Sequence, residues 1–111
     1  MAIFITQARF TQDAVKNLVA RPEDRLAAVE KLVASTGGKL LHYYVTTGEY
    51  DVLLISEAND GADAVIAGMA AAASGAISHI VTTRGWSSSE FKTMAERAQK
   101  ALANYRAPSA A

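Results

Sequence analysis

Hydrophobic positions alternate along four short segments of the chain, a pattern typical of β-strands. These segments are 2–10, 39–47, 50–58 and 76–86. In the first segment Ile3 and Ile5 fall on one face, while Phe4, Ala8 and Phe10 fall on the other. The later segments also carry large apolar residues at both odd and even positions. The pattern therefore predicts strands that are covered on both faces.

Between these strands, apolar residues recur every three or four positions, which predicts helices. The first helix follows Thr11, a suitable N-cap, and stops at Arg21-Pro22. Pro22 is expected in the first turn of a second helix, which ends at Gly37-Gly38. Its expected buried face is Leu26, Val29, Leu32 and Val33.

Two further helices are expected in the second half of the chain. One begins after Asn59 or Asp60, with an inward stripe of Val65, Ile66, Met69 and Ala73. The last begins with a capping box, Ser87 and Glu90, and runs to about residue 106. Its apolar side is expected to comprise Phe91, Met94, Ala95, Ala98, Leu102 and Tyr105.

The order of elements is βαββαβ followed by one more helix. With right-handed crossovers this order predicts an α+β, ferredoxin-like domain: a four-stranded antiparallel sheet with helices on one face. We expect a single domain over residues 1–107 and a frayed end over 108–111. The apolar second face predicts that another copy covers it, so that two sheets close into a dimeric α/β barrel. The last helix is the candidate for assembly beyond that dimer.

Composition narrows the classes of function. Eleven basic and eleven acidic residues balance, which argues against nucleic acid held through phosphates and against a polybasic membrane anchor. The chain has no cysteine, so disulfides and thiolate chemistry are excluded. No apolar run approaches the roughly 20 residues of a membrane span, and no signal region is evident. We therefore expect a soluble, cytoplasmic protein that binds neither nucleic acid nor membrane.

Small and aromatic residues suggest where a ligand could bind. The stretch 70–76 is almost entirely alanine, serine and glycine, so it either lets a helix pack closely or leaves a cavity open. Tyr43, Tyr44 and Trp86 lie on or at the end of strands. They either fill interfaces or line a small-molecule pocket between sheet and helix.

Histidine and arginine supply the remaining candidate chemistry. His42 and His79 fall on the two edge strands, too far apart within one copy to share a metal, and no metal-ligand spacing is present, so no metal or cofactor is expected. Each is either a packing residue or a general base or haem ligand in a barrel pocket. Arg9 and Arg84, expected near one rim of the sheet, either receive an anionic group or pair with local acids.

The turn Thr47-Gly48-Glu49-Tyr50-Asp51 joins the second and third strands. Gly48 suits a positive φ in a tight hairpin, and Asp51 can accept hydrogen bonds from turn amides. Tyr50 can pack its ring while its hydroxyl reaches a polar partner. These residues either stabilise the turn or contact a ligand.

This G-x-Y-D turn, with the apolar strand after it, resembles the signature of the GYD domain family. The order of the other elements agrees over about residues 2–95. A similar turn occurs in the ligand-binding domain of the leucine-responsive regulator family, which shares the βαββαβ plan. The resemblance implies a ferredoxin-like, dimeric α/β barrel and no particular chemistry.

Three functional classes follow. The first is a homo-oligomeric small-ligand-binding or regulatory module without catalysis, which the lack of phosphate-binding and nucleophile-elbow motifs favours. The second is a cofactor-independent or haem-linked monooxygenase-like enzyme, using His42, His79, Tyr43, Tyr44 or Arg84. The third is a scaffold that binds a partner protein. The candidate ligand-binding residues are His42, Tyr44, Tyr50, Asp51, His79, Arg84, Arg9 and Trp86.

Overall fold

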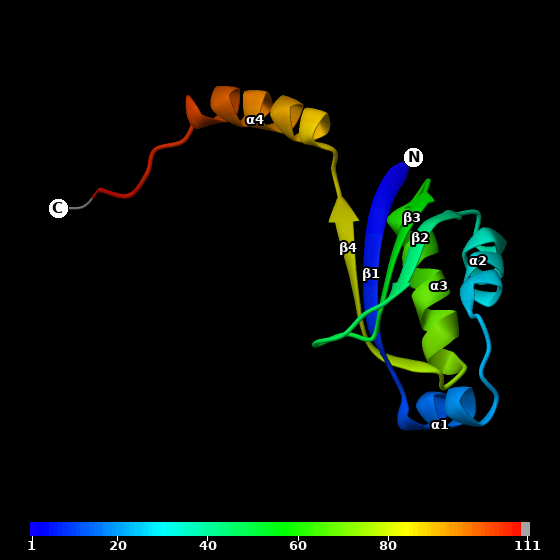
Figure 1. Cartoon of the computed structure of the whole chain (residues 1–111). Helices are drawn as coiled ribbons and strands as arrows, with labels where there is room; N and C mark the ends of the chain where they lie inside the picture. Colours follow the sequence, from blue (N-terminus) through cyan, green and yellow to red (C-terminus); the bar gives the residue numbers. More distant parts are fainter. Residues whose placement is uncertain (110–111) are drawn as a thin grey trace.

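The computed structural model describes residues 1–109 and contains one four-stranded sheet and four helices (Figure 1). The strands are β1 (Ala2–Phe10), β2 (Lys39–Val45), β3 (Val52–Ala58) and β4 (Ile77–Gly85). The helices are α1 (Gln12–Ala20), α2 (Leu26–Ser35), α3 (Gly61–Ala73) and α4 (Ser88–Leu102). None of the helices within residues 1–109 is long and apolar enough to cross a lipid bilayer.

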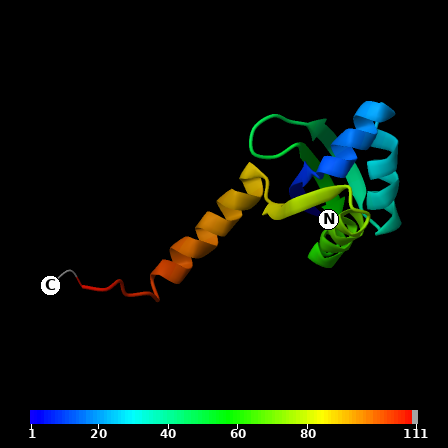
Figure 2. The same cartoon turned by 90° about the horizontal axis from the view of Figure 1, so that it is seen from below.

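The sheet has the strand order β2-β3-β1-β4, and every neighbouring pair is antiparallel. Helices α1, α2 and α3 lie on one side of this sheet (Figures 1 and 2). This arrangement confirms the ferredoxin-like α+β fold that the order of elements predicts. His42 and His79 lie on the two edge strands, as expected.

The two faces of the sheet differ in their surroundings. Phe4, Thr6 and Ala8 of β1 are buried beneath the helices, and their β3 partners are Ser56, Leu54 and Val52. The opposite side, which we call the open face, has no helix layer. Its apolar side chains are Ile3, Ile5, Tyr44, Leu53, Ile55 and Val81. The structure thus confirms apolar residues on both faces of the sheet.

Both edge strands contain a bulge that simple alternation does not predict. The register of β2 against β3 shifts between Leu40 and His42, and that of β4 against β1 shifts opposite Gln7 and Arg9. His79, in the second bulge, has a positive φ of 52°. An extra residue reverses the alternation beyond it. Leu40 therefore shares the helix-side face with Tyr43, and Ile77 shares it with Ile80, whereas strict alternation would place the two members of each pair on opposite faces.

Most predicted helix ends are correct. The side chains of Thr11, Asp60 and Ser87 accept hydrogen bonds from the first turns of α1, α3 and α4. Gly37 has a positive φ of 87° just after α2, as a left-handed cap requires. The predicted start of α2 is wrong, because residues 22–25 are not helical. The carboxylate of Asp24 instead accepts a hydrogen bond from the Leu26 amide, so α2 starts at Leu26.

The predicted inward stripe of α3 is also wrong. Val65, Ile66 and Met69 are 51%, 51% and 64% exposed and point away from the sheet. The small residues of α3 face the sheet instead, and a Cβ at Gly68 would lie 3.6 Å from Ile80. Alanine and glycine thus form the inner wall of α3, and its bulky residues form an outer stripe.

Helix α4 projects away from the rest of the molecule (Figures 1 and 2). It ends at Leu102, and Tyr105 lies beyond this end. The prediction from its spacing that Tyr105 lies on the helix is therefore wrong. Residues 108 and 109 have no regular secondary structure, and the remainder of the expected frayed end, 110–111, lies outside the described residues.

Candidate functional site

A cavity of about 1010 Å³ separates the sheet from the three helices that cover it. This volume is at the upper end of the roughly 300–1,000 Å³ typical of small-molecule sites. Among the described residues only five apolar side chains are buried, namely Phe4, Ala8, Val33, Val52 and Ala58. The helices therefore enclose space that side chains do not fill. Of the two alternatives for the small residues around 70–76, the structure shows the open cavity.

The walls of the cavity are mainly aliphatic. Ala64, Ala67, Gly68 and Ala71 form the side contributed by α3. Helices α1 and α2 contribute Leu18, Val29, Leu32 and Val33, and the sheet contributes Val52, Leu54 and Ile77. Short side chains on one wall leave room, and branched side chains on the others provide an apolar surface.

A few polar groups lie along the sheet side of the cavity. Thr6 and Ser56 are only 9% and 5% exposed. The Thr6 hydroxyl lies 3.5 Å from that of Thr82. The Ser56 hydroxyl makes no hydrogen bond within residues 1–109. Every side-chain polar atom that is fully enclosed in these residues has a partner, so the Ser56 hydroxyl is not fully enclosed. Ser56 therefore presents an unpaired hydroxyl to the cavity.

Exposed residues of the segment that joins α1 to α2 form one rim of the cavity. Arg21, Pro22, Glu23 and Arg25 line this rim, and Arg25 Nη1 lies 2.9 Å from Glu23 Oε1. Tyr43 of β2 also lines the cavity. Burial raises the pKa of the Tyr43 hydroxyl above its ordinary value, more than the nearby Arg25 charge lowers it. At neutral pH Tyr43 is therefore an uncharged hydrogen-bonding group.

The G-x-Y-D turn lies at the C-terminal end of β1, and none of residues 47–51 lines this cavity. Asp51 Oδ2 accepts a 2.9 Å hydrogen bond from the Phe10 amide, and the Asp51 amide donates one of 3.0 Å to the Ala8 carbonyl. Thr46 donates to the carbonyls of both Asp51 and Tyr50. Gly48 has a positive φ of 102°, as expected. The turn thus has a structural role, and the ligand-contact role of Asp51 stays a prediction.

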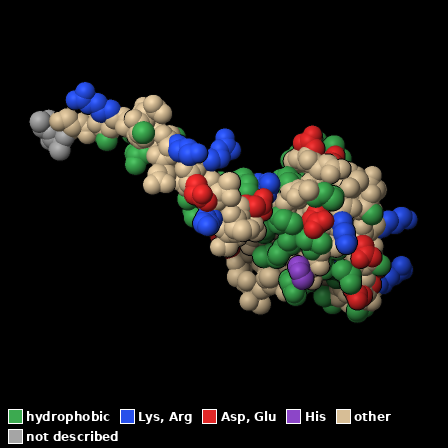
Figure 3. Space-filling model, turned by 90° about the horizontal axis from the view of Figure 1, so that it is seen from above, with side chains coloured by type: hydrophobic (Ala, Val, Ile, Leu, Met, Phe, Trp, Pro, Cys, Tyr) green, Lys and Arg blue, Asp and Glu red, His purple; other side chains and the backbone are tan. Residues whose placement is uncertain are grey.

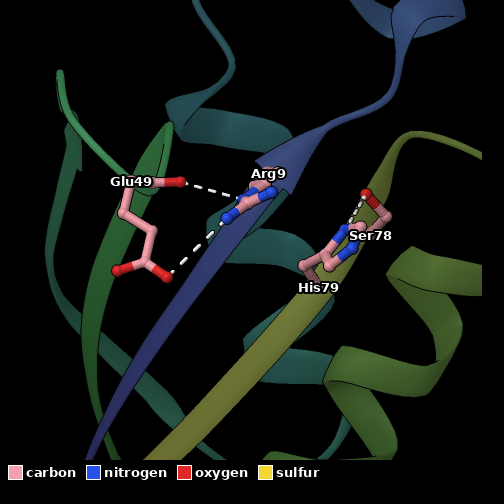
Figure 4. A network of polar contacts seen from close by, with 4 residues as sticks. All are labelled: Arg9, Glu49, Ser78 and His79. Atoms are coloured by element: carbon pink, nitrogen blue, oxygen red, sulfur yellow. Dashed lines mark hydrogen bonds and ion pairs between the residues drawn. The ribbon is translucent and has the colours of Figure 1, made fainter.

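Arg9 and His79 are brought to the same end of the sheet (Figure 4), and Tyr50 lies near Arg9. Arg9 Nε donates to the Glu49 carbonyl at 2.9 Å, and Arg9 also forms an ion pair of 3.7 Å with the Glu49 carboxylate. The Arg9 guanidinium lies 5.8 Å from the centre of the Tyr50 ring. His79 Nδ1 lies 3.0 Å from the Ser78 hydroxyl. The local acid therefore already pairs with Arg9.

Arg84 lies at the other end of the sheet, which contradicts the predicted pairing of Arg9 and Arg84 at one rim. Because β1 and β4 are antiparallel, Arg84 is opposite Phe4, whereas Arg9 is opposite Ser78. Five residues of strand separate the two arginines, about 17 Å. Arg84 instead lies over the rings of Trp86 at 4.6 Å and Phe4 at 5.9 Å, and it donates to the Gly85 carbonyl.

His42 and Tyr44 lie side by side on the open face, with parallel rings 6.2 Å apart. Both are exposed and neither lines the cavity. Within residues 1–109 no three His, Asp or Glu side chains come together as a metal site requires. Of the predicted aromatic residues, Tyr43 alone lines the cavity, because the bulge at Leu41 turns it toward the helices.

Sequence reasoning did not identify Ser56, Thr6 or Arg25 as site residues. Thr6 and Ser56 occupy helix-side positions of buried strands between apolar neighbours, and a polar residue on a buried face is a usable signal. Arg25 gives no such signal, because its place at the rim depends on the irregular path of residues 22–25.

Comparison with solved structures shows the same fold in one protein and finds lower similarity to others. The protein TTHA0845 from Thermus thermophilus is 15% identical, with a TM-score of 0.51 over 79% of this chain and 96% of that one. The hypothetical protein PHS023 from Pyrococcus horikoshii is 16% identical, with a TM-score of 0.46 over 78% and 92%. Protein Atu4242 from Agrobacterium tumefaciens gives the same four values as PHS023.

No curated protein matches the chain. Residues 4–95 match the GYD domain, and this range includes the sheet except for Ala2 and Ile3, all of α1 to α3 and the first half of α4. The turn at Gly48, Tyr50 and Asp51, which resembles the signature of that family, fastens the hairpin to β1 within the matched range. The chain therefore belongs to the GYD domain family.

Proposed function

We propose that the chain is a homo-oligomeric module that binds a small molecule, without catalysis, in the cavity between sheet and helices. The observation that carries this proposal is a cavity of about 1010 Å³ whose wall holds the unpaired hydroxyl of Ser56. If the cavity only reflected loose packing, an apolar residue at this position would make the fold more stable, because a buried hydroxyl without a partner is destabilising.

The lining indicates the kind of ligand. Most of the ligand surface would contact aliphatic side chains, so its body is apolar. An oxygen or nitrogen atom at the buried end would pair with Ser56. The opposite end would lie at the rim near the guanidinium group of Arg21, where an anionic group is favoured, because Arg25 already pairs with Glu23.

Self-association would use the open face. Its apolar side chains, centred on Ile5 and Ile55, have no cover within one copy, and sheets commonly pack face to face about 10 Å apart. Two copies packed in this way would keep both cavities on the outer sides of the paired sheets, each behind its own helices. Ligand binding and self-association would therefore occupy different surfaces.

The binding site can be tested with 8-anilinonaphthalene-1-sulfonate, a fluorescent probe with an apolar body and one anionic group. Ala71→Leu adds bulk inside the cavity, and Ala72→Leu adds the same bulk on the exposed side of α3. We expect Ala71→Leu to weaken probe binding at least tenfold and Ala72→Leu to change it less than twofold. Unfolding midpoints should stay close to wild type, because Ala71→Leu fills existing space.

Native mass spectrometry of the purified protein provides a second measurement. A retained small molecule in the wild type that is lost in Ala71→Leu and kept in Ala72→Leu supports the proposal. Equal probe binding by all three proteins would show that the probe does not enter the cavity and would contradict the proposed site.

A further inference from the structure

Helix α4 forms an arm with little contact to the rest of its own chain. The Cα radius of gyration is 18.4 Å, whereas about 13 Å is expected for a compact domain of this length. The longest dimension is 63 Å, and Figures 1 and 2 show that α4 and the residues after it account for the extension. The fold of the sheet and of the other helices therefore does not depend on α4.

The arm is amphipathic, and its apolar side has no cover. Phe91, Met94 and Leu102 are 63%, 40% and 67% exposed, and with Ala95 and Ala98 they follow one side of the helix. Isolated helices of about 12–15 residues are only marginally stable in water, even with good caps. A stable α4 therefore needs a surface against which this stripe is buried.

The direction of the arm indicates which surface that is. In both ribbon views α4 leaves the β4 edge toward the side of the sheet that α1 and α2 do not cover (Figures 1 and 2). Seen from above, hydrophobic side chains gather on the body next to the root of the arm (Figure 3). The open face and the arm thus form two sides of a corner, and a molecule seated on the open face would lie against α4.

The exposed area agrees with a large self-interface. One copy exposes 8124 Å², about 2,200 Å² more than the roughly 5,900 Å² expected for a compact protein of 11.7 kDa. Standard interfaces bury about 800 Å² per partner, and obligate dimers bury more. The excess is therefore sufficient for an interface that includes both the open face and the arm.

Charge also favours a second copy. The last helix and the residues just after it carry four basic and two acidic side chains: Lys92, Arg97, Lys100, Arg106, Glu90 and Glu96. Because the whole chain balances at eleven of each, the rest of the chain carries the matching acidic excess of two. A basic arm is therefore complementary to the acidic body of another copy.

We propose that α4 clasps a second copy of this chain, each copy burying the stripe of Phe91, Met94 and Leu102 against its partner. The inference rests on the proposed homo-oligomer and adds the element that stabilises it. Fifteen helical residues span about 22 Å, and paired sheets lie about 10 Å apart. The arm is therefore long enough to pass the partner's sheet and reach the layer of helices behind it.

The test compares two full-length variants that each add one negative charge in the first turns of α4. Phe91→Glu alters the stripe, and Thr93→Glu alters the opposite side of the helix. Sedimentation equilibrium measures the dimer dissociation constant, and hydrogen exchange reports on the amides of residues 88–102. We expect Phe91→Glu to raise the constant at least tenfold and to abolish protection of α4, while Thr93→Glu changes the constant less than twofold.

Circular dichroism should show both variants folded, since the domain does not depend on α4. The clasp would be overturned if the wild type is dimeric and the dissociation constant is unchanged in Phe91→Glu or raised equally in both variants. The sheet-face dimer would then still stand. A wild type that stays monomeric at 100 μM would overturn both the clasp and the proposed homo-oligomer. Probe binding in the cavity is independent of either result.

Discussion

Asp51 connects three strands of the sheet at one point. Its carboxylate accepts from the Phe10 amide, its own amide donates to Ala8 of β1, and its carbonyl accepts from Thr46 just after β2. The hairpin is thereby attached to β1 beyond the last paired residues, Ala8 and Val52. Only the bond from the Phe10 amide uses the acidic side chain, and this bond explains in physical terms why the turn carries an aspartate.

We therefore expect Asp51→Ala to destabilise the fold by about 1.5–3 kcal/mol, as for loss of a hydrogen bond to a charged group. Asp51→Asn should cost less, because its amide oxygen can still accept from Phe10. Urea unfolding followed by circular dichroism measures both variants. Glu49→Ala is the control, since its carboxylate makes only an exposed 3.7 Å ion pair. An unchanged midpoint for Asp51→Ala would refute the structural role.

The stability of the N-terminus of α4 depends on the protonation state of the Glu90 carboxyl. Glu90 Oε1 accepts from the Ser87 amide at 2.9 Å, and the Ser87 hydroxyl accepts from the Glu90 amide at 3.1 Å. The hydrogen bond from the Ser87 amide lowers the pKa of the Glu90 carboxyl below its ordinary value. A carboxyl with a lowered pKa stabilises the capped helix above its unfolded pKa, and this stabilisation is lost as the pH falls through the folded value.

We expect the amides in the first turn of α4 to lose protection from hydrogen exchange as the pH is lowered below about 4.5. Their exchange should then be faster than the change in intrinsic rates with pH explains. Glu90→Gln should remove this pH dependence, because glutamine can fill the capping box without titrating. A wild type and a Glu90→Gln variant with the same pH profile would show that the capping carboxylate is not responsible.

At the level of elements, the features that could be predicted from the sequence are those that depend on neighbouring residues, such as helix caps. Thr11, Asp60 and Ser87 cap helices as expected, because a cap depends on only a few neighbouring residues. The faces of β2 and β4 do not follow simple alternation along the sequence, since a bulge at Leu41 or His79 arises from pairing with another strand. The orientation of α3 was predicted incorrectly, because the largest residues need not face the sheet when an alanine wall can leave a cavity.

The candidate site was less predictable than the fold. The alanine-rich stretch pointed to the cavity as one of two alternatives, and Tyr43 was among the residues considered. Ser56 and Arg25 were not, because the first lies in an ordinary strand and the second reaches the rim through an irregular segment. A cavity is defined by where several elements fail to touch, and such a property is not encoded in any single stretch of sequence.

The whole molecule combines few fully buried side chains with two uncovered apolar surfaces, the open face and the α4 stripe. One copy therefore resembles part of a larger assembly more than a self-contained core. Ile5 lies near the centre of the open face, beside Ile55 and Thr83. Its side chain would be buried only when a second copy is present.

We expect Ile5→Glu to weaken self-association at least tenfold in sedimentation equilibrium, because it would place a charge between two apolar sheets. Val19→Glu makes a similar change on α1, where the side chain is 74% exposed and away from the open face, and it should leave self-association unchanged. If both variants associate like the wild type, the open face is not the interface.

The two bulges have a further consequence, which concerns aggregation. An edge strand offers unpaired amides and carbonyls to any other extended chain, and a regular edge invites uncontrolled addition of strands. Here β2 and β4 are the two edges, and each carries one bulge that interrupts its ladder and increases its local twist. The edges are therefore poor templates for strand addition, and the bulges disfavour open-ended growth of the sheet while leaving its face free to associate.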